Sequence, residues 1–104
     1  MKLSDVAAAL ASDVRINILR WLQDPQAEFV SQREGDLSEH GACLSLIAAK
    51  AGISVPTASR HIERLMQVGL VKTTRIRPWN FHAIDADGLD RALRLFDELR
   101  SGHR

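Results

Sequence analysis

The stretch that decides the fold is residues 43–68, CLSLIAAKAGISVPTASRHIERLMQV. Its first part repeats apolar residues at helical spacing, at Leu44, Ile47, Ala48 and Ala51. Gly52 interrupts this pattern, and glycine readily takes the left-handed conformation that ends a helix. Ser54 is a good N-terminal cap for a second helix, in which Pro56 sits early enough to be tolerated. The predicted buried stripe of that helix is Ala58, Ile62, Leu65 and Met66.

On the C-terminal side of this helix pair, Gly69 is followed by a predicted hairpin. Residues 70–77 and 79–84 have the composition of strands, with Pro78 at the turn between them. A last helix begins near Asp85 or Asp87. Its apolar residues fall on one predicted stripe: Leu89, Ala92, Leu93, Phe96 and Leu99.

On the N-terminal side, two further helices are predicted. Residues 3–11 have apolar residues at helical spacing, and Ser12 can cap the next helix. That helix is expected to end near Asp24-Pro25, because the residue before proline is biased away from helical angles. The polar connection 25–41 is long, and Asp24-Pro25 could start a short helix through Phe29 and Val30.

Length and charge restrict the class of protein. With 104 residues the chain is expected to form one small domain, and a single cysteine excludes a disulfide framework. The longest apolar run, residues 6–11, is too short to span a bilayer, so we expect a cytoplasmic protein without a membrane contact. The net charge is +1, yet residues 43–84 alone carry +5. This basic centre indicates a polyanionic partner.

The order of predicted elements is helix, helix, helix, turn, helix, hairpin, helix, which is a mainly α (α+β) winged helix-turn-helix. In this arrangement the second helix of the pair enters the DNA major groove by its N-terminal part, and the hairpin is the wing. Arg60 can bind guanine through two hydrogen bonds, whereas Arg64, one turn further on, suits a phosphate contact or plain solvation. The predicted DNA-binding residues are Ser54, Val55, Pro56, Thr57, Ser59, Arg60, His61, Arg64, Lys72, Arg75 and Arg77.

The central part of the chain resembles the ArsR/SmtB family of bacterial winged-helix repressors. The resemblance lies in residues 47–62, IAAKAGISVPTASRHI, and in Gly69-Leu70-Val71. Residues 11–19 are similar to the start of that family, and Arg75, Trp79 and Phe81 to its wing. The resemblance implies a repressor that binds a palindromic operator in double-stranded DNA as a homodimer. It divides the chain into dimerisation helices over 1–11 and 86–101, a helix-turn-helix over 43–68 and a wing over 70–84. The implied dimer contacts are Leu3, Val6, Leu10, Leu89, Leu93, Phe96 and Leu99.

The sequence departs from the family where many members bind metals. Cys43-Leu44-Ser45-Leu46 stands in place of a Cys-Val-Cys-Asp pattern, and one cysteine cannot supply the two or three thiolates of a soft-metal site. A second family site uses Asp and His on the last helix; Asp85, Asp87, Asp97 and His103 are available here, but the paired-histidine spacing is missing. We therefore predict no metal and no cofactor, and the effector stays unknown. The wing turn also differs, with Arg77-Pro78 where the family usually has glycine.

Several residues have a plainer interpretation. Cys43 is expected to be a small buried hydrophobic residue, with a redox or effector role as the alternative. A cation site at Asp36, Glu39, His40 and Cys43 competes with a solvated loop. His82 is expected to be exposed or half-packed, and Trp21 and Trp79 to serve packing.

Two other functional classes stay open. An enzyme with a Cys43 nucleophile is disfavoured, because no oxyanion hole or cofactor motif accompanies the cysteine. A winged-helix module that binds another protein is the other alternative, since a fold alone does not fix a function.

Overall fold

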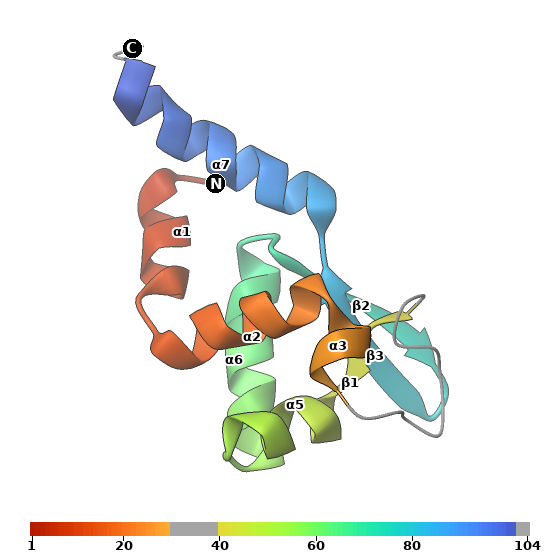
Figure 1. Cartoon of the computed structure of the whole chain (residues 1–104). Coiled ribbons are helices and arrows are strands. Elements are labelled where there is room, and N and C mark those ends of the chain that lie inside the picture. Colours follow the sequence, from red (N-terminus) through yellow and green to blue (C-terminus); the bar gives the residue numbers. More distant parts are fainter. Residues whose placement is uncertain (30–39, 102–104) are drawn as a thin grey trace.

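The computed structural model describes residues 1–29 and 40–101 and shows a mostly helical chain with a small antiparallel sheet (Figure 1). The elements in chain order are α1 (Leu3–Leu10), α2 (Asp13–Gln23), α3 (Pro25–Glu28), β1 (Ala42–Cys43), α5 (Leu44–Ala51), α6 (Val55–Gln67), β2 (Val71–Ile76), β3 (Trp79–Ile84) and α7 (Ala86–Ser101). The predicted winged helix-turn-helix is confirmed, with α5 and α6 as the helix pair and β2 and β3 as the wing.

The helix ends agree with the predicted caps. The Ser12 hydroxyl accepts a hydrogen bond of 3.2 Å from the Arg15 amide, and Gly52 ends α5 in the left-handed conformation with φ of 70°. The short helix expected after Asp24-Pro25 is present as α3, with the Asp24 carboxylate accepting from the Ala27 amide at 3.4 Å. It ends at Glu28, and Val30 lies outside the described residues.

The sheet contains a strand that the sequence analysis missed. Strand β1 pairs antiparallel with β3, so that the sheet order is β1-β3-β2. The helix expected to begin at Cys43 begins instead at Leu44, because Cys43 is extended and pairs with Phe81. Gly41 permits this approach: a Cβ there would lie 2.0 Å from the carbonyl oxygen of His82.

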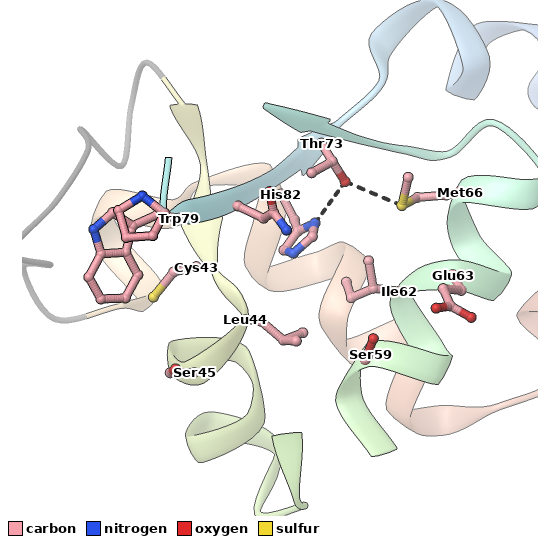
Figure 2. Close-up of a pocket in the computed structure, with 12 residues that line it drawn as sticks. Cys43, Leu44, Ser45, Ser59, Ile62, Glu63, Met66, Thr73, Trp79 and His82 are labelled. Carbon is pink, nitrogen blue, oxygen red and sulfur yellow. Dashed lines mark hydrogen bonds between the residues drawn. The ribbon is translucent and has the colours of Figure 1, made fainter. Parts of the chain in front are cut away.

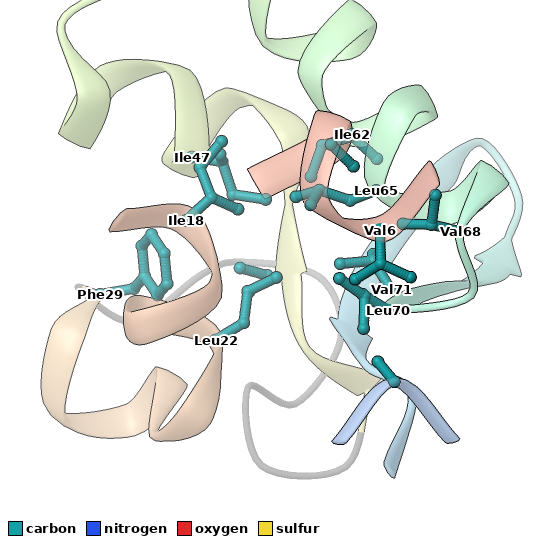
Figure 3. Close-up of a cluster of buried hydrophobic side chains, with 13 residues drawn as sticks. Val6, Ile18, Leu22, Phe29, Ile47, Ile62, Leu65, Val68, Leu70 and Val71 are labelled. Atoms are coloured by element: carbon teal, nitrogen blue, oxygen red, sulfur yellow. The ribbon is translucent and has the colours of Figure 1, made fainter. Parts of the chain in front are cut away.

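The core lies between the helices and the inner face of the sheet (Figure 3). Its largest fully buried side chains are Phe81, Ile18, Ile47, Leu65, Leu70 and Val6. Val6, a predicted dimer contact, is 0% exposed in its own chain and packs in the core. Met66 is 41% exposed, and the predicted stripe of α6 is correct only for Ala58, Ile62 and Leu65. Met66 follows Leu65 by about 100° around the helix, which turns it from the core toward the hairpin.

Helix α7 has two apolar faces where the sequence predicts one stripe. Its inner face packs on the core and consists of Leu89, Ala92 and Leu95. Its outer face consists of Leu93, Phe96 and Leu99, which are 56%, 40% and 71% exposed. The helix runs beside α1 (Figure 1), and the two are in contact. The dimer prediction for Leu89 therefore falls on a residue that already packs within its own chain.

Within the parts of the chain that the structure describes, no helix has both the length and the apolar character needed to cross a membrane.

Candidate nucleic-acid interface

The N-terminal turns of α6 carry a connected set of exposed polar side chains. The Ser54 hydroxyl accepts from the Thr57 amide at 3.2 Å and donates to the Thr57 hydroxyl oxygen at 2.9 Å. Arg60 Nη2 donates to the same Thr57 oxygen at 3.2 Å. Because residues three apart on a helix share a face, these side chains form one row along α6. The row holds the Arg60 guanidinium over the first turns of the helix.

The electrostatics of this helix end favour an anion. The first turn of α6, which the structure describes in full, holds no acidic residue, and its free backbone N–H groups carry the positive end of the helix dipole. Val55 and Pro56 are exposed beside the cap, and Ser59 is half-buried. Arg64 is exposed further along the helix. The arrangement can therefore bind phosphate at its end and hydrogen-bonding groups along its row.

His61 contacts Arg15 of α2, and Arg15 in turn contacts the end of α1. Arg15 Nη1 lies 3.1 Å from His61 Nδ1, while Arg15 Nε donates to the Ala9 carbonyl at 2.5 Å and Nη2 to the Ala8 carbonyl at 3.4 Å. One guanidinium thus joins the end of α1 to the middle of α6. Desolvation by burial lowers the pKa of His61 below its ordinary value of 6.5, and the positive charges of Arg15 and Arg60 lower it further.

Arg15 is a residue that the sequence analysis did not single out as part of the site. It lies 46 positions from His61, and no local pattern connects the two. The sequence leaves a phosphate contact or a packing role open for His61, and its Nδ1 is already used within the chain.

The wing presents exposed cations on two faces. Val71 pairs with Ile84 at the base of the hairpin, and Ile76 pairs with Trp79 next to the turn. Side chains alternate along a strand, so Lys72 lies on the opposite face from Arg75, and Arg77 is in the turn. All three are exposed. The structure therefore brings Arg75 and Arg77 toward the tip but separates Lys72 from Arg75.

His82 and Cys43 differ from what the sequence predicts. His82 is only 6% exposed, although an exposed or half-packed side chain is expected from the strand pattern. Desolvation lowers its pKa from 6.5 to about 4. Cys43 is half-buried rather than enclosed, because this last residue of β1 lies beside a cavity.

The packing role predicted for Trp21 is confirmed, since its ring meets Phe29 edge-on at 6.5 Å and Lys50 Nζ lies 5.3 Å from its centroid. Trp79 is 43% exposed beside the cavity that Cys43 also lines.

The candidate metal residues are only partly placed. Asp36, Glu39 and His103 lie outside the described residues. Among residues 1–29 and 40–101, no group of three or more His, Cys, Asp or Glu side chains is close enough to hold a metal ion.

Comparison with known proteins places the chain among transcriptional regulators. The family model described as "Bacterial regulatory protein, arsR family" matches residues 36–73, which span β1, the helix pair and the start of the wing. The uncharacterized HTH-type transcriptional regulator YbzH of Bacillus subtilis (strain 168) is 30% identical over 87 residues, covering 84% of this chain and 87% of that protein. Both the family model and this relative describe transcriptional regulators.

Solved structures share the fold at lower identity. An ArsR-like transcriptional regulator from Rhodococcus sp. RHA1 superimposes with a TM-score of 0.68 at 20% identity, over 96% of this chain and 80% of that one. A homodimeric winged helix-turn-helix DNA-binding domain from Mycobacterium bovis gives 0.63 at 23% identity, over 96% of this chain and 79% of that one.

Proposed function

We propose that this chain represses transcription as a homodimer on a palindromic operator. The proposal starts from its membership of the ArsR family of bacterial regulatory proteins, as a transcriptional regulator with a winged helix-turn-helix DNA-binding fold. The observation that carries this proposal is the row of Ser54, Thr57 and Arg60 on the exposed end of α6. The row presents hydrogen-bonding groups and a positive charge where a recognition helix meets DNA.

In this proposal α6 enters the major groove by its N-terminal end. Arg60 donates two hydrogen bonds to a guanine, and Ser54 and Thr57 bind base edges or the adjacent backbone. Arg75 and Arg77 at the wing tip, with Lys72 on its other face, bind phosphates. The remaining members of the surface, which contact the same DNA segment less directly, are Val55, Pro56, Ser59, His61 and Arg64.

The homodimer is proposed to form through α1 and α7. The exposed apolar face of α7 supports this, and it consists of Leu93, Phe96 and Leu99. A monomeric soluble protein seldom leaves a contiguous patch of large apolar side chains in water. Leu3 and Leu10 on α1 are half-buried and can extend the interface. A two-fold dimer would place its two α6 helices about 34 Å apart, in successive major grooves.

The test begins with selection of bound DNA from a random pool, followed by anisotropy titrations on the selected sequence. Arg60→Ala should cost about 1–3 kcal/mol at one base position and relax the preference there. Lys72→Ala should weaken binding to all sequences about equally and reduce the salt slope by about one. Arg20→Ala, which removes an exposed charge from α2, is the matched control. If Arg60→Ala and Lys72→Ala both behave like this control, the proposed surface is wrong.

The dimer has its own test by sedimentation. Leu93→Ser together with Phe96→Ser should convert a dimer to a monomer. Ile76→Ser removes a side chain that is 40% exposed on the hairpin, and it should leave the mass unchanged. A wild-type chain that sediments as a monomer at micromolar concentration would overturn this part of the proposal.

A further inference from the structure

A cavity of about 360 Å³ lies between the helix pair and the wing (Figure 2). One wall comes from α6 through Ile62 and Met66, and the facing wall comes from the hairpin through Trp79 and His82. Leu44, at the start of α5, lines it from below. The volume lies near the lower end of the range for small-molecule sites. The lining mixes apolar side chains with polar ones, among them Ser59, Thr73 and His82.

One of the polar side chains that line this cavity is His82, which is only 6% exposed. Its Nδ1 lies 2.9 Å from the Thr73 hydroxyl oxygen, which in turn lies 3.2 Å from the sulfur of Met66. Thioether sulfur can only accept, so the Thr73 hydroxyl donates to Met66. The single hydroxyl proton is then used, and Thr73 must accept from His82 Nδ1–H. This chain of contacts leaves His82 Nε2 as an unprotonated acceptor.

Nε2 has no hydrogen-bond partner among residues 1–29 and 40–101. Among the described residues, no side-chain nitrogen or oxygen is both fully enclosed and without a hydrogen-bond partner. Since Nε2 has no partner, it is not fully enclosed, and the cavity that His82 lines gives access to it. Burial lowers the pKa of His82 to about 4, which keeps the imidazole neutral near pH 7. An unprotonated acceptor on a largely buried side chain therefore faces the cavity without a donor from the described residues.

The charges around the cavity select against an anion. Among the described residues that line it, Glu63 is the one charged at neutral pH, and none is Lys or Arg. An anionic ligand would meet a carboxylate at the rim and no cation. A neutral ligand with one donor group would give Nε2 a hydrogen bond, and its apolar part would cover the apolar side chains of the cavity.

We propose that this cavity is a binding site for a small neutral phenol-like molecule, whose hydroxyl donates to His82 Nε2 and whose ring packs against the apolar side chains that line the cavity. The two walls belong to α6 and to the wing, so a bound ring would set the separation between them. A consequence, which rests on the proposed function, is that the ligand changes affinity for the operator by moving the wing relative to α6.

The first experiment measures binding to the full chain without DNA. ¹⁵N-labelled protein is titrated with 4-methylphenol and with two control molecules. Toluene lacks the hydroxyl donor, and benzoate carries a negative charge. 4-Methylphenol should shift the His82 Nε2 and Trp79 indole resonances, leave His61 unshifted, and bind at least tenfold more tightly than either control. Toluene or benzoate binding as tightly, or an unshifted His82, would overturn the site.

Two variants separate the hydrogen bond from the packing. His82→Phe should weaken 4-methylphenol at least tenfold and change toluene binding less than threefold. Trp79→Ala, at a partly exposed position where folding should survive, should weaken both molecules. Equal affinity of wild type and Trp79→Ala for 4-methylphenol would also overturn the site.

The second experiment adds the selected operator. A saturating concentration of 4-methylphenol should change operator affinity at least threefold, and Trp79→Ala should reduce this effect. Binding of the phenol with unchanged operator affinity would overturn the regulatory step alone. Operator binding without any phenol binding would overturn the site and leave the proposed function standing.

Discussion

Replacing Arg15 by Met tests whether the long-range contact of α6 with the N-terminal helices forms in solution. Methionine keeps a flexible apolar stem in the half-buried site but removes every donor. The change therefore deletes the hydrogen bonds to Ala9, Ala8 and His61 together.

The expected loss follows from what these contacts leave behind. Ala9 is 0% exposed, so its carbonyl has little access to water once Arg15 is gone. An unsatisfied buried acceptor costs about 1–3 kcal/mol. Ala8 is exposed and its contact is long at 3.4 Å, so water replaces it at little cost. We expect Arg15→Met to lower the free energy of unfolding by about 1–3 kcal/mol at pH 7.5.

The same substitution changes the titration of His61. Desolvation still lowers its pKa, but the Arg15 charge no longer does, so the pKa should rise toward 6.5. In the wild-type chain the unfolded state binds a proton at His61 more readily than the folded state, and stability falls as the pH drops below 6.5. This part of the pH dependence should be shallower in Arg15→Met.

Urea unfolding between pH 5 and 7.5, with an NMR titration of His61, measures both effects. Arg20→Met removes an exposed charge from the same helix and should change stability by less than about 0.5 kcal/mol. If Arg15→Met loses no more than this control and the pKa of His61 does not rise, the contact between Arg15 and α6 is not formed and the argument fails.

Three further substitutions have expected outcomes in the same unfolding assay. In the wild-type chain the free energy of unfolding should fall by about 3 kcal/mol as the pH drops from 6.5 to 4, because the unfolded state binds a proton at His82 in this range and the folded state, with a pKa of about 4, does not. His82→Phe should remove this fall. An unchanged pH dependence of stability would contradict the burial of His82. Gly88→Ala should cost more than about 3 kcal/mol, since its Cβ would lie 1.6 Å from the Gly69 carbonyl oxygen and backbone must move. Gly52→Ala should cost only about 1–2 kcal/mol, because its φ is +70° but nothing lies within 4 Å; equal losses at the two glycines would refute the distinction.

The features predictable from sequence are those with local causes. Ser12, Gly52 and Ser54 act through neighbours within four residues, and the structure has each of them at the helix end where the pattern predicts it. The hairpin is also local, since its strands are adjacent in the chain and paired from Val71 to Ile84. The exposed row of α6 follows from the same helix spacing that predicts its buried face.

What the sequence does not predict depends on distant partners. Strand β1 has two residues, too few for an alternating pattern, and it exists because β3 is beside it. Val6 has the spacing of a surface stripe, but the core encloses it because α1 packs on α2 and α7. Helical periodicity identifies the apolar positions of α7 without saying which of them face the core and which face outward.

Contacts that involve two histidines hold α6 from both sides. On one side His61 contacts Arg15, which binds the end of α1, the helix proposed for the dimer. On the other side Met66 contacts Thr73 and, through it, His82 in the wing. Both contacts lie on α6, the helix whose row of Ser54, Thr57 and Arg60 is proposed to face DNA. This makes α6 the element through which both the dimer surface and the cavity beside the wing would act on operator affinity.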